Sequence, residues 1–383
     1  MTKAIYIGVS NKARKVKKIY VGVSNKARLV KKGYIGIGGK ARLFFSNEQS
    51  VIRNGNGTAL TNTVNQIASV SDFNGCAIFA GGFKNSTSAT VNTIDSYNAS
   101  LTKQTVLTLS QARANIASAV IGNYAIFAGG YQKSTVDTLT NKFVRSTTTG
   151  VNNTGASYMG GASNGIYAYF AGGLNGTSTY LKTITGYNSN LARMTKLNLS
   201  VARYGMASIS APSMYLAVFA CGQIAANSAT NVINYINSRN VLGSVNGGAI
   251  VQFPAGGLAG NNMIIAGGFA GNGSSTYIAF SYNASFVRTT CTNLQYSRGY
   301  LSCTSLGDYC IFAGGAGNKT INKNQLAYVD IYNSSLVHSV GTNLGTARAQ
   351  LGAATVGNYA IFAGGCTTSE TVATNVTDIY KLG

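Results

Sequence analysis

The residue types that carry most protein chemistry are scarce in this sequence. Among 383 residues there are one histidine, His338, and eight acidic residues. A zinc site with three histidines cannot be built within one such chain, and a Ser-His-Asp triad could use only His338 as its base. We interpret His338, which lies beside an expected outer strand, as a surface or rim residue. The composition therefore predicts a protein that is not an enzyme and that holds no metal or cofactor.

The sequence contains six cysteines, but no two are spaced as C-x-x-C or as ligands of a metal. They are Cys76, Cys221, Cys291, Cys303, Cys310 and Cys366. We expect buried thiols within strands, with a redox or metal pair such as Cys303 and Cys310 as the alternative.

The overall composition favours a folded, strongly basic protein. Hydrophobic residues make up 45% of the chain and charged residues only 10%, against about 25% charged residues in an average soluble domain. Glycine is abundant with 47 residues and proline is rare with two, which disfavours disorder. No apolar run is long enough to span a membrane, and no signal peptide is visible. The formal net charge is +22.

The N-terminal residues 1–46 repeat with a period of 14. The units are IYIGVSNKARKVKK from Ile5, IYVGVSNKARLVKK from Ile19 and GYIGIGGKARLFFS from Gly33. Each unit alternates apolar and other residues on both sides of a dipeptide that suits a tight turn. These dipeptides are Ser10-Asn11, Ser24-Asn25 and Gly38-Gly39. The pattern predicts three short β-hairpins.

Residues 1–46 also hold much of the positive charge, because they contain nine lysines, three arginines and no acidic residue. So small and self-repelling a sheet can scarcely fold alone. We therefore expect it to attach to other copies of itself or to an acidic surface. The candidate attachment residues are Lys12, Arg14, Lys15, Lys17, Lys18, Lys26, Arg28, Lys31, Lys32, Lys40 and Arg42.

A second repeat, with a period near 47, fills the remaining chain. Its marker is an apolar strand that ends in Ala-Gly-Gly or a close variant. The copies are Cys76–Gly82, Tyr124–Gly130, Tyr167–Gly173, Leu216–Gly222, Met263–Gly268, Tyr309–Gly315 and Tyr359–Gly365. Segments such as IDSYNASL from Ile94 and LSQARANIAS from Leu109 recur between the copies and add further strands.

Four short antiparallel strands in each repeat are typical of a propeller blade. We therefore predict an all-β protein, with a seven-bladed β-propeller over residues 57–383. Residues 47–56 are predicted to be a linker and a ring-closing strand, because the last repeat lacks one strand. Pairing of the stretch from Val51 to Leu60 with the last blade would remove an exposed sheet edge.

These repeats resemble the kelch-repeat β-propeller family in the strand that ends in Gly-Gly and in the tyrosine that follows it. The resemblance covers roughly residues 51–383. Many kelch repeats carry a tryptophan after that tyrosine, whereas this chain has none. The residues near that place are Leu101, Leu191, Phe286 and Leu336.

Charged residues recur at two repeat positions. Aspartates hold one position as Asp95, Asp137, Asp330 and Asp378, and arginines hold the other as Arg113, Arg203, Arg298 and Arg348. Three repeats have both, which predicts structural ion pairs between Arg113 and Asp137, Arg298 and Asp330, and Arg348 and Asp378. The alternative is a ring of carboxylates at the central channel that binds a cation.

Polar loops follow the Gly-Gly strands and should gather on one face. Loops rich in asparagine and tyrosine suit the recognition of a sugar or a protein by hydrogen bonding and ring stacking. The candidate ligand-binding residues are Lys84, Asn85, Asn175, Tyr180, Asn272, Tyr277, Asn318 and Lys319.

The tandem unit in residues 4–46 resembles segments of phage and prophage structural proteins of Gram-positive bacteria, where it precedes variable C-terminal domains. The resemblance implies a virion or tail-associated protein with an attachment module and a display module. Residues 1–46 would bind other virion or tail proteins, and the propeller loops would bind a host cell-surface receptor or glycan. We expect a homo-oligomer on the phage particle, made in the host cytoplasm.

Two alternatives remain at this point. One is a protein that decorates a capsid or tail without a receptor role. The other is a nucleic-acid binder, prompted by the net charge of +22. Against the second alternative, the basic residues are concentrated in the hairpin segment, and no motif that reads RNA or DNA is present.

Overall fold

A computed structural model describes residues 6–9, 12–15, 20–23, 26–30, 32–37, 40–46, 50–84, 89–152, 155–194, 197–320, 322 and 324–383. The chain forms two compact units, residues 1–50 with Gly383 and residues 51–382.

The first unit contains separate two-stranded antiparallel hairpins. Their strands are β1 (Tyr6–Val9) with β2 (Lys12–Lys15), β3 (Tyr20–Val23) with β4 (Lys26–Leu29), and β5 (Lys32–Ile37) with β6 (Lys40–Ser46). The registers are equivalent, since glycine lies opposite alanine in the pairs Gly8↔Ala13, Gly22↔Ala27 and Gly36↔Ala41. The predicted turn dipeptides and Lys17, Lys18 and Lys31 lie outside the described residues.

The second unit is built from small antiparallel sheets, most of them with four strands. The innermost strands are β9 (Ala68–Phe73), β14 (Ala117–Ile121), β19 (Gly160–Ser163), β25 (Ala207–Ala211), β30 (Ala255–Ala259), β34 (Ser302–Leu306) and β38 (Gly352–Val356). The second strands are β10 (Cys76–Ala80), β15 (Tyr124–Ala128), β20 (Tyr167–Ala171), β26 (Leu216–Ala220), β31 (Asn262–Ala266), β35 (Tyr309–Ala313) and β39 (Tyr359–Ala363).

The outer half of each sheet is less regular. The third strands are β12 (Thr93–Asn98), β16 (Val136–Thr140), β23 (Thr183–Asn188), β28 (Ser228–Ile236), β32 (Ala279–Tyr282), β36 (Val329–Asn333) and β40 (Thr377–Leu382). The outermost strands are β13 (Lys103–Thr108), β17 (Arg145–Thr148), β24 (Leu197–Asn198), β29 (Leu242–Val251), β33 (Arg288–Thr290), β37 (His338–Val340) and β7 (Val51–Asn56). Short strands in the loops are β8 (Val64–Asn65), β11 (Phe83–Lys84), β18 (Ala156–Ser157), β21 (Leu174–Asn175), β22 (Thr179–Tyr180) and β27 (Gln223–Ala225).

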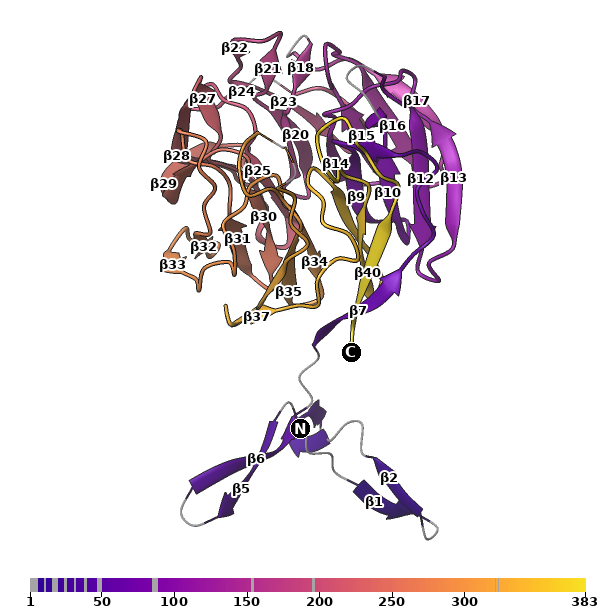
Figure 1. The fold of residues 1–383 in the computed structure, drawn as a ribbon, viewed down its shortest axis with the longest axis vertical. Coiled ribbons are helices and arrows are strands. Elements are labelled where there is room, and N and C mark those ends of the chain that lie inside the picture. Colours follow the sequence, from indigo (N-terminus) through magenta and orange to yellow (C-terminus); the bar gives the residue numbers. More distant parts are fainter. Residues whose placement is uncertain are drawn as a thin grey trace. The chain divides into compact units, whose positions relative to one another are not determined.

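The innermost strands contact one another in a closed cycle. Going round, β9 is followed by β14, β19, β25, β30, β34 and β38, and β38 contacts β9. Figure 1 shows several of these strands near the centre, with β13, β17 and β33 at the periphery. The unit therefore has an all-β, propeller-like fold. The 3-10 turn η1 (Pro212–Met214) is the one helical element among the described residues.

The core lies between neighbouring sheets, where the second strands are buried on both faces. Phe79, Phe127 and Phe312 are each at most 1% exposed. A Gly-Gly pair ends all of these strands except β26, which is followed by Cys221-Gly222, and it suits this place because the chain turns in the left-handed region against a neighbouring backbone. At Gly315, with a φ of +113°, a Cβ atom would lie 2.8 Å from the carbonyl oxygen of Gly299.

The turn between the third and fourth strands explains the recurring Tyr-Asn motif. The Oδ1 atom of Asn333 accepts hydrogen bonds from the amides of Ser335 and Val337, each at 3.0 Å. Leu336 adopts a φ of +60° in this turn. Its side chain packs against the core, so an aliphatic residue here has a defined packing role.

The first strand of the second unit completes its last sheet, in the order β38-β39-β40-β7. Val51 lies opposite Leu382, and Asn56 lies opposite Asp378. The prediction of a closing strand from this stretch is confirmed. The compact unit therefore begins at Val51 and not at residue 57.

Candidate functional site

One residue from each sheet, placed just before the innermost strand, forms a ring around the centre of the second unit. All of these residues have a positive φ, between 52° and 61°. They are Gln66, Asn115, Tyr158, Gly205, Phe253, Tyr300 and Gln350. A left-handed conformation is costly for residues other than glycine, so their shared geometry must be imposed by the surrounding structure.

Backbone hydrogen bonds link these residues to one another and impose that geometry. The amide of Gln66 donates to the carbonyl of Gln350 at 3.0 Å, and the amide of Gln350 donates to the carbonyl of Tyr300 at 3.0 Å. The amide of Phe253 likewise donates to Gly205 at 2.8 Å. The bond between Gln66 and Gln350 joins the first repeat to the last, so this arrangement crosses the point of ring closure.

The side chains of this ring line a cavity of about 310 Å³ at the mouth of the central channel. We call it the axial pocket. Its wall also contains the residue that follows each ring position, and these are Ile67, Ile116, Met159, Met206, Pro254, Leu301 and Leu351, together with Ser302. A volume of about 300 Å³ is at the lower end of the range for small-molecule sites.

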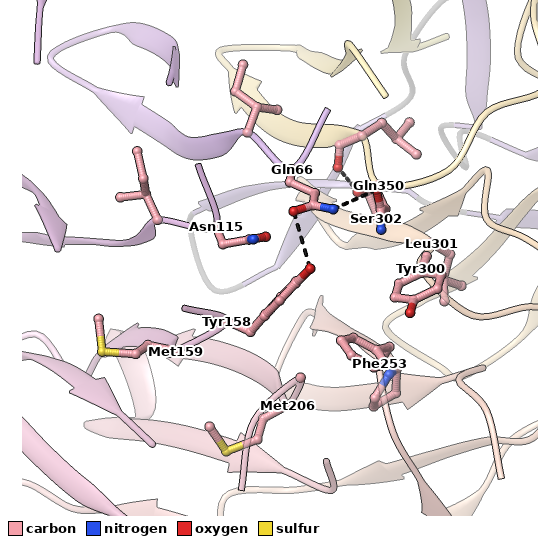
Figure 2. Close-up of a pocket in the computed structure, with 15 residues that line it drawn as sticks. Gln66, Asn115, Tyr158, Met159, Met206, Phe253, Tyr300, Leu301, Ser302 and Gln350 are labelled. Atoms are coloured by element: carbon pink, nitrogen blue, oxygen red, sulfur yellow. Dashed lines mark hydrogen bonds between the residues drawn. The ribbon is translucent and has the colours of Figure 1, made fainter. Parts of the chain in front are cut away.

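One side of the axial pocket is lined by amides. The Nε2 atom of Gln66 donates to Oε1 of Gln350 at 3.0 Å, and the hydroxyl of Tyr158 donates to Oε1 of Gln66 at 3.3 Å. Figure 2 shows these contacts and places Asn115 on the same side. Behind them, the Nε2 atom of Gln350 donates to Oε1 of Glu370 at 3.1 Å. Glu370 thereby fixes the orientation of the Gln350 amide.

The opposite side is aromatic. The rings of Phe253 and Tyr300 lie 4.6 Å apart between centroids, and those of Tyr158 and Phe253 lie 5.9 Å apart. Tyr204 packs behind them, 5.6 Å from Phe253. In Figure 2, Tyr158, Phe253 and Tyr300 face the same space as Gln66. The pocket thus offers ring faces opposite hydrogen-bonding amides.

The axial pocket is electrically neutral in its lining, because none of its lining residues carries a formal charge. Burial raises the pKa of Tyr158, and the charge of Glu370 adds to that shift. Burial also raises the pKa of Tyr300 well above its usual value. Both phenols therefore stay protonated at neutral pH and can donate hydrogen bonds. Such a lining suits an uncharged ligand with hydroxyl groups and one apolar face.

The predicted loop residues have different fates. Tyr180 and Lys319 lie near the axial pocket, because the ring of Tyr180 packs 5.5 Å from Tyr204 and the Nζ atom of Lys319 lies 3.2 Å from Oε1 of Gln223. Tyr204 donates to that same Gln223 oxygen at 2.7 Å. None of the described loop residues lines the pocket itself, and five of them are exposed: Lys84, Asn175, Asn272, Tyr277 and Asn318. Asn85 lies outside the described residues.

Sequence reasoning missed the ring residues themselves. The sequence did contain a sign of these positions. The motifs that precede the innermost strands align with one another, and at one shared position they carry different residues, Asn115, Gly205 and Gln350. A variable residue inside a regular repeat indicates a place where the scaffold does not dictate the side chain. Glu370 had no repeat signal of any kind.

The predicted structural ion pairs are present and buried. Arg113 lies 2.5 Å from Asp137, and Arg298 lies 2.6 Å from Asp330. Arg348 likewise pairs with Asp378. Each arginine also donates to backbone carbonyls of the second strand, as Arg113 does to Phe127 at 3.1 Å. These aspartates are held within their sheets by arginine, so a carboxylate ring at the central channel is wrong.

His338 belongs to one of these ionic clusters. It lies on the outermost strand β37, as a rim residue would, but its side chain is turned to a buried partner rather than to solvent. Its side chain is 12% exposed, and its Nε2 atom lies 2.6 Å from Oδ1 of Asp330. Asp330 thus lies between Arg298 and His338. Lys103, Arg145 and Arg53 contact Asp95, Asp137 and Asp378 from the equivalent outer strands.

Within the described parts of the chain, no three side chains of histidine, cysteine, aspartate or glutamate are grouped as metal ligands. The same residues include no helix with the length and apolarity that crossing a membrane requires.

No protein-family model matches this chain, and no curated protein is significantly similar to it in sequence. Among solved structures, the chain is similar to that of YjhT, with a TM-score of 0.58 and 12% sequence identity. The match covers 72% of this chain and 98% of the other. At this identity the likeness concerns the fold alone.

Proposed function

We propose that residues 51–382 form a seven-bladed, kelch-like β-propeller that binds a host cell-surface glycan in the axial pocket. The closed cycle of innermost strands supports the propeller, and each sheet of that cycle then counts as one blade. The proposed role is binding without a catalysed reaction.

The composition of the axial pocket is the observation that supports a glycan as the ligand. Tyr300 and Phe253 offer ring faces, and Gln66 and Gln350 offer amide groups across the same cavity. A pyranose ring needs both kinds of contact, because its C–H face packs on an aromatic ring while its hydroxyls need donors and acceptors. A neutral lining favours a neutral saccharide over an anionic one, since no lining cation would offset the desolvation of a negative charge.

The proposal extends to the whole chain as a virion or tail-associated protein. Residues 1–46 would anchor it to other particle proteins, which their twelve basic residues and lack of acidic ones support. β7 pairs Val51 with Leu382 and Asn56 with Asp378. This register places Val51 at the end of its sheet that is distant from the axial pocket. A homo-oligomer of such chains would bind a repetitive cell surface with avidity.

Binding of the full chain to an array of bacterial and synthetic glycans tests the ligand. We expect neutral saccharides to bind, and we expect Tyr300→Ala and Gln66→Ala each to weaken binding by about tenfold or more. Tyr277→Ala is the matched control, because Tyr277 is an exposed tyrosine outside the pocket. Equal binding by all of these variants would exclude the axial pocket as the site.

Adsorption to host cells separates this role from the alternative of a decoration protein. Particles that carry the Tyr300→Ala chain should assemble normally but adsorb more slowly. A chain without residues 1–46 should fold but fail to join the particle. Normal adsorption by the Tyr300→Ala particles would favour decoration without a receptor role.

A further inference from the structure

The cysteines Cys303 and Cys310 lie side by side on adjacent strands of one sheet. In the pairing of β34 with β35, Cys303 lies opposite Phe312 and Ser305 lies opposite Cys310. The two cysteines are therefore diagonal neighbours on one face, and their Sγ atoms are 3.1 Å apart. A disulfide bond needs these atoms only about 1 Å closer.

One of the two thiols can be reached from the central channel. Cys303 is partly exposed and lines a second cavity of about 580 Å³, which we call the channel cavity. Hydroxyl side chains such as Ser69, Ser118 and Ser208 line the same cavity from other innermost strands. Cys310 is fully buried. A small reagent in the channel cavity would therefore meet Cys303 first.

The neighbouring sheet leaves room for both sulfur atoms. Gly257 on β30 packs directly over them, so a Cβ atom there would lie 2.6 Å from the Cys303 sulfur and 2.9 Å from the Cys310 sulfur. The other cysteines lack such a pairing where their thiols are described. Cys221 and Cys366 donate instead to the carbonyls of Ala249 and Ala349.

We propose that Cys303 and Cys310 form a reversible redox site, oxidised to a disulfide by a low-molecular-weight disulfide that enters the channel cavity. This site is independent of glycan binding. The Cys303 thiolate attacks the small disulfide, forms a mixed disulfide and releases one small thiol. Cys310 then attacks the Cys303 sulfur and releases the second small thiol. The two protein thiols are oxidised, their protons end on the two small thiols, and the small disulfide is reduced.

The order of attack follows from the surroundings of the two sulfur atoms. Burial raises the pKa of the Cys310 thiol well above its usual value, and the hydrogen bond with Cys303 adds to that shift. Cys310 is thus a poor first nucleophile and is close enough to act second. The product would join β34 to β35 covalently within the wall of the channel.

Treatment of the full chain with hydroxyethyl disulfide, followed by removal of the reagent, tests the proposal. We expect two of the six thiols to be lost, and we expect peptide mapping without reductant to show Cys303 linked to Cys310. Dithiothreitol should restore both thiols. Six free thiols after treatment, or a link between other cysteines, would overturn the proposal.

Matched variants make the result specific. Cys303→Ser should fold, because serine already holds equivalent places on β9, β14 and β25. It should abolish the internal link and leave Cys310 unmodified. Cys366→Ser is the control, and it should still form the link between Cys303 and Cys310. An internal disulfide that persists in Cys303→Ser would assign the oxidation to a different pair.

Discussion

The guanidinium of Arg53 lies 2.5 Å from Oδ1 of Asp378, although 325 positions separate the two residues in the chain. Arg53 belongs to β7 and Asp378 to β40, so this ion pair fastens the first strand of the ring to its last sheet. Arg348 holds the other oxygen of the same carboxylate. The same aspartate, Asp378, therefore takes part both in the ion pair within its sheet and in the contact that closes the ring.

Deletion of residues 51–58 tests how much this closure contributes. Without β7, β40 becomes an unpaired edge and Asp378 loses Arg53. We expect a fall of several degrees in the thermal unfolding midpoint, measured by circular dichroism. Deletion of residues 1–46 is the control, since it leaves β7 in place. An unchanged midpoint in the first deletion would refute a closing role for β7.

Substitution of Arg298 should be among the most damaging changes in the protein. Arg298→Met would leave Asp330 buried, with His338 and the amide of Gln295 still in contact with it but with no arginine beside it. Loss of one partner of a buried pair typically costs about 3–5 kcal/mol. Arg203→Met is the matched control, because Arg203 is equally buried but its side chain donates to the carbonyls of Phe219 and Val201. Urea unfolding should show a clearly smaller loss for the control. Equal losses would mean that the carboxylate partner is unimportant.

The sheet of Arg203 offers the opposite experiment. Asn234 occupies the place held elsewhere by aspartate, and its Oδ1 atom accepts from the hydroxyl of Ser200 at 3.1 Å. Asn234→Asp would add a carboxylate near Arg203. Burial lowers the pKa of the Arg203 guanidinium to about 10. We expect a gain in unfolding free energy on the order of 1.5 kcal/mol at neutral pH.

The pH dependence of this gain has a definite sign. Arg203 and the Ser200 donors favour the ionised carboxylate, so its folded pKa should lie below the value of about 3.9 in the unfolded chain. The gain is then fully present above that value and is lost as the pH falls through the folded pKa. Unfolding measured at about pH 7 and about pH 3 checks this. A gain that is the same at both pH values would contradict the explanation.

The second glycine of each Gly-Gly pair should resist substitution. Gly315→Ala would combine a positive φ with a Cβ atom 2.8 Å from a carbonyl oxygen, at a cost of about 1–3 kcal/mol. Gly317→Ala is a gentle comparison, because its nearest neighbour is an oxygen at 3.7 Å. Thermal unfolding of the two variants separates backbone strain from a general effect of added volume. Similar midpoints would show that Gly315 is not needed.

The proposed binding of a glycan at the axial pocket should be insensitive to alkaline pH. Burial raises the pKa of both Tyr158 and Tyr300, so these phenols keep their protons beyond the usual value of about 10. Calorimetric titration of the bound saccharide should therefore give the same affinity from about pH 6 to about pH 10.5, a range in which a phenol of ordinary pKa would lose its proton. A steep fall in affinity within that range would mean that another group contacts the ligand.

The repeat pattern predicted much of the architecture because equivalent residues face equivalent surroundings. The Ala-Gly-Gly strands became β10, β15 and their counterparts, and the missing strand of the last sheet was found at Val51–Asn56. The pairs of arginine and aspartate could be predicted for the same reason. The strand registers place Asp137 opposite Phe127 and Asp330 opposite Phe312, which is the same position in the two sheets.

The axial pocket could not be predicted in the same way. Gln66 and Gln350 are far apart in the chain and meet only because the ring closes. The spacing of the repeats along the sequence does not show which residues the closure brings together. The loop residues Lys84 and Tyr277 were expected at the site because of their chemical type. The structure instead places the pocket-lining positions in the segment that directly precedes the innermost strand of each repeat.

The ring positions at the axial pocket are held in place by hydrogen bonds between main-chain amides and carbonyls, which do not depend on the identity of the side chain. Glutamine, asparagine, tyrosine, phenylalanine and glycine all occupy this conformation within one molecule. The lining of the pocket and the folding of the chain are therefore uncoupled here: a new set of side chains could change what the axial pocket accommodates while every strand keeps its place.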